Sequence, residues 1–158
     1  DVCSSDLAIV RQVPARLCLI GDGPDREHAL AVAADLGVQD RVEHLGMQDQ
    51  LETLLPNADL FLSASETESF GLSMLEAMSC GVPCVSTQVG GVAEVLGDTG
   101  RLVPFANPEA MAQAALPLLQ NVDQHAKLSV AARQRAVDHF ATERIVARYE
   151  QIYARIVG

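Results

Sequence analysis

Two acidic residues, Glu68 and Glu76, flank a largely apolar run that is entered through Phe70 and Gly71, within SETESFGLSMLEAMSCGVPCV (65–85). Residues 72–80 predict a helix that is apolar nearly all round, and such a helix is buried on most of its sides. A buried carboxylate without a partner costs several kcal/mol, so Glu76 is expected to have one: an arginine, water, or the hydroxyl pair of a ligand. A carboxylate that accepts two hydrogen bonds side by side matches a vicinal diol such as ribose. The residues alone leave a ligand and a structural ion pair open.

A glycine, Gly71, opens this predicted helix. The first N–H groups of a helix have no partners within it, and the helix dipole adds about half a positive charge there. Gly71 lacks a Cβ, so a phosphate is able to approach the backbone closely. Gly90 and Gly91 precede a second predicted helix start, which either supplies further free N–H groups or is a plain loop and cap.

Two further glycines lie in GDGPDR (21–26), directly after a predicted strand. A dinucleotide-binding fingerprint has the form G-x-G-x-x-G, but Arg26 occupies the position of its third glycine. This departure argues against an NAD-binding protein. Gly21 and Gly23 therefore either make a tight turn or contact another ligand.

The next predicted strand ends at Gly46, within LGMQDQLE (45–52). Gln48 or Asp49 is expected to cap the helix that follows. Alternatively, the same loop presents backbone groups to a base.

Short apolar runs with β character alternate with helical stretches along much of the chain. This rhythm predicts a Rossmann-like α/β fold, a parallel sheet with right-handed crossovers, and continuous apolar runs predict strands covered by helices on both faces. Ligands of such sheets bind beyond the carboxyl ends of the strands, where the residues discussed above lie. The predicted strands are 16–20, 41–45, 59–62, 83–86 and 101–103, and the predicted helices between them are 25–36, 48–55, 72–80 and 91–96.

After residue 103 the pattern changes to helices alone, over 108–120, 123–139 and 142–156. Pro117 is expected to kink or end the first of them, and Thr142 to cap the last. At the other end, residues 7–12 are typical of the last turns of a helix. Residues 1–7 are polar and non-periodic, and we expect a non-native or disordered start there.

The composition is ordinary for a soluble globular protein, with a formal net charge of −10 over 158 residues. This charge disfavours nucleic acid and anionic lipid surfaces as partners. We find neither a run of about 18 apolar residues nor a charged-then-apolar signal segment, and we expect a cytoplasmic protein. The four cysteines lack the spacing of a zinc site, so we expect reduced, packed thiols and no metal.

The motifs follow one another in a recognisable order. Two motifs come first along the chain, LIGDGP (19–24) and RVEHLG (41–46). Glu68 and Glu76 follow, separated by seven residues, and after them come CGVPC (80–84) and GGVAE (90–94). Over about residues 8–158 the chain resembles the donor-binding, C-terminal half of retaining glycosyltransferases of family 4, which have the GT-B fold. Its ESFGL and CGVPC motifs and the tail IVARYEQIYARI resemble the branch that joins N-acetylglucosamine to L-malate in bacillithiol synthesis.

The resemblance implies a UDP-sugar as donor and a role for each matched residue. As the catalytic residue, Glu68 would position the donor sugar, while Glu76 would hold the ribose hydroxyls. The family's usual mechanism needs no obligatory metal or other cofactor, because the leaving diphosphate accepts the acceptor's proton. The further donor-binding residues would be Ser69, Phe70, Gly71 and Leu72 at the sugar and diphosphate, Gly21 and Gly23 in the cleft, and Val42 and Gly46 against the uracil.

In this family a second, N-terminal domain binds the acceptor, and an arginine–lysine pair just before the matched region neutralises the diphosphate. The 158 residues carry neither, so we expect this chain to be catalytically inactive by itself, with 8–158 as a nucleotide-sugar-binding domain. Two alternatives remain: a family 4 transferase that builds a polysaccharide or lipid glycan, and a nucleotide-sugar-binding module without catalysis. The sequence leaves open whether the acceptor is L-malate and whether the chain forms a homo-oligomer.

Overall fold

The computed structural model describes residues 8–157, so the non-native start expected for residues 1–7 lies outside it. Five short strands alternate with helices, as predicted, and residues 8–12 are helical. The strands are β1 (Leu17–Ile20), β2 (Val42–Gly46), β3 (Phe61–Ser63), β4 (Cys84–Thr87) and β5 (Arg101–Val103). The helices are α2 (Arg26–Asp35), α3 (Leu51–Leu54), α4 (Leu72–Ser79), α5 (Val92–Leu96), α6 (Pro108–Gln120), α7 (Val122–Phe140) and α8 (Thr142–Val157).

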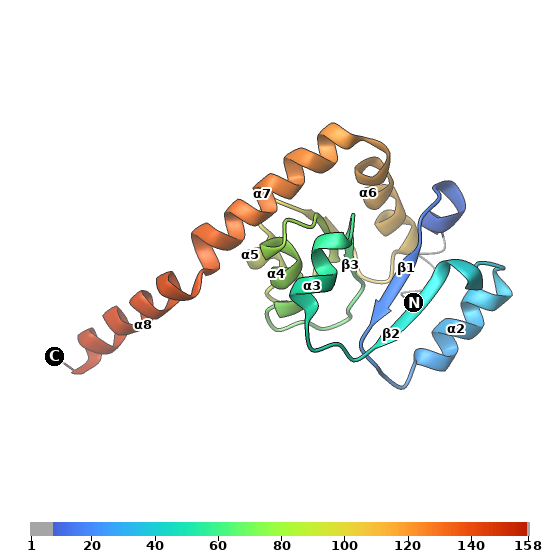
Figure 1. Cartoon of the computed structure of the whole chain (residues 1–158). Helices are drawn as coiled ribbons and strands as arrows, with labels where there is room; N and C mark the ends of the chain where they lie inside the picture. The colour runs from blue at the N-terminus through green and yellow to red at the C-terminus, as the bar shows by residue number, and fades with distance from the viewer. Residues whose placement is uncertain (1–7, 158) are drawn as a thin grey trace.

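All strand pairs are parallel, but their hydrogen bonds form two sheets rather than one (Figure 1). β1 pairs with β2, while β4 lies between β3 and β5. The expectation of strands covered on both faces holds for β4, whose four residues are all buried. It is wrong for β1, where half-buried and exposed residues alternate and Ile20 is 42% exposed. An apolar run alone does not reveal which of its faces a helix covers.

The core lies on the two faces of β4. Cys84 belongs to a cluster formed with α4, α5 and α7, and the next residue, Val85, belongs to a cluster formed with α6 and β5. This follows from the alternation of side chains along a strand. The first cluster includes Met74, Ala77, Met78, Val92, Val95, Leu96, Ala132 and Ala136. Because β3 and β4 are parallel, the loops that lead from them into α4 and α5 lie at the same end of the sheet.

Two expectations concern the helices after β5. α6 continues through Pro117 to Gln120, as its predicted range has it, so of the two alternatives for Pro117, a kink or an end, the end is excluded. Thr142 does not cap α8; the carbonyl of Ala141 already accepts the N–H of Ile145, so Thr142 is the first helical residue.

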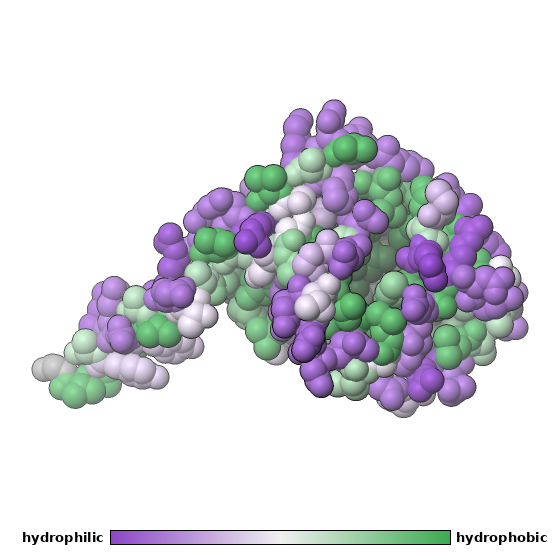
Figure 2. Space-filling model, in the orientation of Figure 1, coloured by the Kyte–Doolittle hydropathy of each residue, from purple (hydrophilic) through white to green (hydrophobic). Residues whose placement is uncertain are grey.

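α8 projects from the rest of the molecule and buries none of its described residues (Figures 1 and 2). Exposed apolar residues along it include Tyr149, Ile152 and Tyr153. Within residues 8–157, no helix combines the length and the apolar character needed to cross a bilayer.

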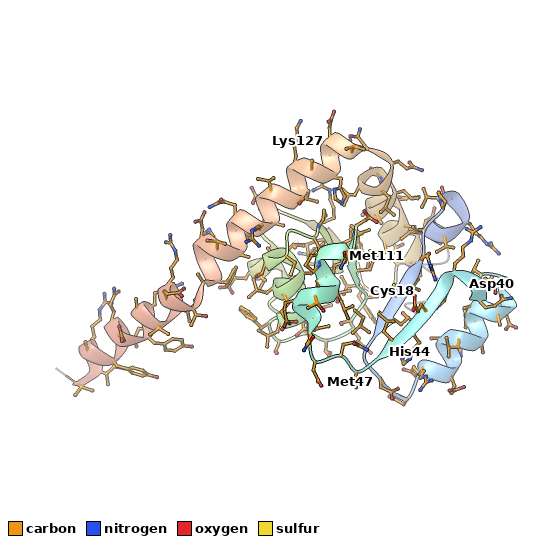
Figure 3. The ribbon with its side chains drawn as sticks, in the orientation of Figure 1. Cys18, Asp40, His44, Met47, Met111 and Lys127 are labelled. Atoms are coloured by element: carbon orange, nitrogen blue, oxygen red, sulfur yellow. The ribbon has the colours of Figure 1, made fainter. Side chains whose placement is uncertain are left out.

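The three cysteines within the described residues are free thiols in different surroundings. Cys84 is buried, and its Sγ lies 3.3 Å from the carbonyl oxygen of Val82, to which it donates. Burial raises the pKa of the Cys84 thiol to about 12. Cys18 is exposed on β1 (Figure 3), so the expectation of packed thiols is wrong for Cys18.

We predict that iodoacetamide at pH 8 alkylates Cys18 and leaves Cys84 unmodified in the folded protein. The thiolate is the reactive form, and Cys84 is both inaccessible and kept protonated. Peptide mass spectrometry after timed quenching measures the two rates, and the same reaction in urea is the control in which Cys84 must react. Equal rates in the folded protein would contradict the position of Cys84.

Candidate functional site

The loop between β3 and α4 turns sharply just before the helix. Gly71 occupies the N-cap position with φ +91°, a left-handed conformation that side chains rarely adopt. No side chain caps the start of α4. Glu68 is half-buried, and its Oε1 accepts the N–H of Phe70 at 3.3 Å in an exposed hydrogen bond. The first N–H groups of α4 therefore keep their capacity to bind a ligand.

The loop between β4 and α5 lies directly against this first loop. A Cβ at Gly90 would stand 1.6 Å from the carbonyl oxygen of Glu68, and one at Gly91 would stand 2.6 Å from that of Ser69. Nearby, the Thr87 hydroxyl donates to the carbonyl of Ser65 at 2.7 Å. Gly90 and Gly91 are thus required for the close approach of two backbones.

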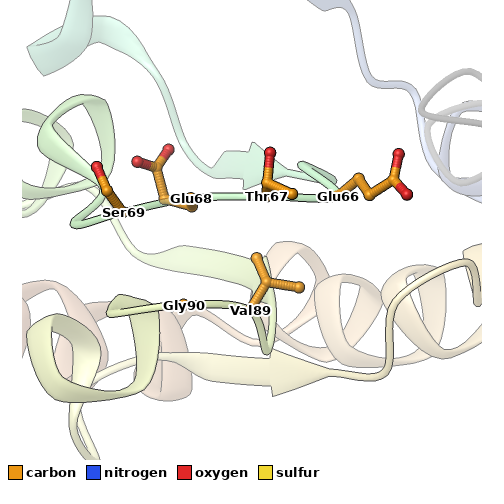
Figure 4. Close-up of a pocket in the computed structure, with 6 residues that line it drawn as sticks. All are labelled: Glu66, Thr67, Glu68, Ser69, Val89 and Gly90. Carbon is orange, nitrogen blue, oxygen red and sulfur yellow. The ribbon is translucent and has the colours of Figure 1, made fainter.

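An open pocket of about 640 Å³ lies along these two loops (Figure 4). Four of the six residues that line it carry carboxylates or hydroxyls, groups that can accept hydrogen bonds from hydroxyls. Of its residues, Glu66, Thr67 and Val89 were not foreseen; their places within two residues of Glu68 or directly before Gly90 in the sequence were the available signal. The lining residues are Glu66, Thr67, Glu68, Ser69, Val89 and Gly90.

Glu76 lies on the exposed side of α4, not in the core. The prediction that it is buried is therefore wrong, and with it the argument that it must have a partner. The alternative of a structural ion pair is not found either: in the described part of the chain the salt bridges join other residues, Arg16 to Glu43 and Arg144 to Asp138. Leu72, at 67% exposure, precedes Glu76 by one helical turn.

Phe70 contacts α7 through its side chain. Its ring meets that of Phe140 edge-on, with centroids 5.8 Å apart and an interplanar angle of 78°. This contact anchors the β3–α4 loop, so the side chain of Phe70 serves packing. Its backbone, together with that of Ser69, Gly71 and Leu72, forms the path from the pocket to the start of α4.

At the ends of β1 and β2 the structure brings Gly21 and Gly46 together. The N–H of Gly21 donates to the carbonyl of Gly46 at 2.8 Å, and both have positive φ. A Cβ at Gly21, Gly23 or Gly46 would meet nothing within 4 Å. Val42 lies at the opposite end of β2 and packs in a small cluster with Val38. The structure therefore brings Gly46, but not Val42, to the carboxyl edge of the strands.

The helix that follows β2 is not capped by the residues predicted to cap it. α3 begins at Leu51, and neither Gln48 nor Asp49 caps it; the N-cap residue is Gln50. The Gln48 amide instead donates to the carbonyl of Leu45. Met47 in the loop after β2 is 75% exposed (Figure 3). Over residues 8–157 there is no group of three His, Cys, Asp or Glu side chains arranged to hold a metal ion.

Comparison with known proteins identifies the family. Residues 1–121 match the sequence model described as "Glycosyl transferases group 1". The chain belongs to this family.

Two curated relatives show how much of a whole protein the chain represents. N-acetyl-alpha-D-glucosaminyl L-malate synthase of Bacillus anthracis is 44% identical over 155 residues, which are 97% of this chain and 41% of that protein. D-inositol 3-phosphate glycosyltransferase of Salinispora arenicola is 38% identical over 143 residues, 87% of this chain and 32% of that protein. The chain thus spans less than half of the length of these relatives.

Solved structures confirm the predicted fold class, parallel strands covered by helices as in one half of a GT-B glycosyltransferase. Sucrose-phosphate synthase from Thermosynechococcus elongatus superposes with a TM-score of 0.86 at 27% identity, over 99% of this chain and 42% of that one. Anabaena Alr3699/HepE, solved in complex with UDP and glucose, superposes with a TM-score of 0.86 at 23% identity. The match covers 97% of this chain and 44% of that one.

We predict that Gly90→Ala lowers the free energy of unfolding by at least about 2 kcal/mol, because its Cβ would force the two loops apart and strain a left-handed residue. Gly23→Ala is the matched control, since its Cβ enters open space. Urea unfolding followed by circular dichroism measures both. Equal stabilities for the two variants would refute the backbone contact.

Proposed function

We propose that the chain is the donor-binding part of a retaining glycosyltransferase that takes its sugar from a UDP-sugar. The observation that carries the proposal is the pocket lined by carboxylate and hydroxyl side chains beside the uncapped start of α4, where hydrogen-bond acceptors for a sugar and N–H donors for an anion adjoin. The name of the Bacillus anthracis relative points to N-acetylglucosamine as the sugar and L-malate as the acceptor. The UDP bound in the Anabaena protein supports a uridine nucleotide.

The nucleotide would bind along the exposed side of α4. The diphosphate is an anion that suits the free N–H groups beginning at Leu72 and the positive end of the helix dipole. Glu76 lies one turn further on the same side, and its exposure leaves both oxygens available to the ribose hydroxyls. Gly21, Gly23 and Gly46 leave open space beside the strand ends, which we propose receives the base.

The sugar would occupy the pocket itself. Glu68 and Ser69 supply acceptors for its hydroxyls from one loop, with Thr67 and Glu66 beside them. We propose that Glu68 acts by hydrogen bonds that tighten as positive charge develops on the sugar ring, and that it is not a general base. The leaving diphosphate would take the acceptor's proton, without an obligatory metal or other cofactor.

The acceptor would bind outside these 158 residues. The curated relatives have more than half of their length beyond the matched region, and we propose that a second domain there holds the acceptor. Residues 8–158 would then be the nucleotide-sugar-binding domain of a cytoplasmic enzyme.

A second acceptor is favoured by a specific observation, the 38% identity to D-inositol 3-phosphate glycosyltransferase. A phosphorylated polyol would then replace L-malate, with the same donor half. Transfer assays with both acceptors, using a protein of the relatives' full length, distinguish the two.

We predict that UDP and UDP-N-acetylglucosamine bind the chain, that NADH does not, and that Glu76→Ala weakens UDP binding by about 1–2 kcal/mol, a roughly five- to thirtyfold rise in Kd. The physical reason is the loss of charge-assisted hydrogen bonds to ribose. Isothermal titration calorimetry measures it.

Glu150→Ala is the matched control for this titration, because Glu150 is an exposed helical glutamate on the projecting α8. It should leave the Kd of UDP unchanged. If Glu76→Ala binds UDP as tightly as the unmodified chain does, Glu76 has no role in holding ribose.

We also predict that these 158 residues alone form no glycosylated malate from UDP-N-acetylglucosamine, because the domain proposed above to orient the acceptor lies outside them. Mass spectrometry of the reaction mixture tests this, with a protein of the relatives' full length as the positive control. Product formed by the chain alone would overturn the assignment of the acceptor site.

A further inference from the structure

α7 contacts both of the helices that follow the pocket's loops, α4 and α5, and bonds the end of each. Its residues Ala132 and Ala136 are buried in the same cluster as α4 and α5. Two arginines flank this apolar contact: Arg133 donates to the carbonyl of Ser79, the last residue of α4, and Arg135 donates to carbonyls at the end of α5. The two helices that the pocket's loops lead into are thus both bonded to α7.

The carbonyl groups at the end of α5 show what Arg135 adds. The last four carbonyls of a helix have no partners within it. Here the backbone N–H of Gly97 donates to the carbonyl of Ala93, and the N–H and hydroxyl of Thr99 both donate to the carbonyl of Leu96. The two remaining carbonyls belong to Glu94 and Val95, and the Arg135 guanidinium bonds each at 2.7 Å.

The site of the guanidinium exists because residue 97 is a glycine. A Cβ at Gly97 would stand 2.6 Å from Arg135 Cζ. Gly97 also has φ +55° and ends the helix. The chain therefore leaves a fitted space in which Arg135 reaches the backbone of α5.

We propose that Arg135 is a positioning residue for the pocket, holding α5 so that Gly90 and Gly91 stay against the backbone of the β3–α4 loop. α5 has five residues and is about 7.5 Å long, so a tilt at one end displaces the other by a comparable amount. Burial of Val92 and Val95 is non-directional, whereas a planar guanidinium bonded to two carbonyls fixes direction. The effect on ligand binding rests on the proposed function; the effect on the glycines does not.

The test compares Arg135→Met, which keeps the apolar stem, with Arg135→Lys, which keeps the charge and one or more N–H donors. Arg148→Met on α8 is the control, because Arg148 is exposed on the helix that projects from the molecule. The readouts are the backbone amide resonances of Gly90 and Gly91 against those of Gly21 and Gly46, and the Kd of UDP, all well below the unfolding temperature.

In Arg135→Met we expect the Gly90 and Gly91 resonances to shift while those of Gly21 and Gly46 stay, and UDP binding to weaken about five- to tenfold. Arg135→Lys should show smaller shifts of the Gly90 and Gly91 resonances and a smaller loss of UDP affinity than Arg135→Met. Should Arg135→Met fail to fold, Arg135→Lys decides by the same resonances.

Unchanged Gly90 and Gly91 resonances in a folded variant would overturn the proposal. So would equal shifts at all four glycines, the signature of general destabilisation. If the unmodified chain binds no UDP and yet the two glycines shift, the proposed function fails while the positioning role of Arg135 stands.

Discussion

At Gly90 the backbone of one loop meets the carbonyl of Glu68 with no room for a side chain between them. This contact places the start of α5 beside the start of α4, and both of its residues line the pocket. Thr87 reinforces it, since its buried hydroxyl bonds the first loop at Ser65. The pocket is therefore made by two loops that support each other.

The rest of the fold keeps those loops in place. β4 is buried on both faces, so neither the strand nor the loop that leaves it has room to shift without disturbing two clusters. α7 spans the first cluster and touches the site region through Phe140, which packs on Phe70. The polar groups that face a ligand thus lie on backbone fixed by burial and by hydrogen bonds.

The sequence was informative where local patterns decide the outcome. Five strands lie within two residues of their predicted positions, and Gly71 caps α4 with the positive φ that only glycine adopts easily. The sequence was misleading where distant segments decide the structure. The periodicity of α4 identifies its polar positions, but it does not show that the side bearing Glu76 faces solvent. Likewise the sequence predicts only a helix start at Gly90 and Gly91. Glycine is required there because the backbone lies against residues 68 and 69, a contact that no local sequence rule predicts.

The central claim is that a uridine nucleotide binds at the start of α4, and a crystal structure of the chain with UDP tests it most directly. The account predicts diphosphate oxygens within hydrogen-bonding distance of the N–H groups that begin at Leu72, and ribose hydroxyls on the Glu76 carboxylate. UDP bound elsewhere, with the start of α4 contacting no ligand, would contradict it.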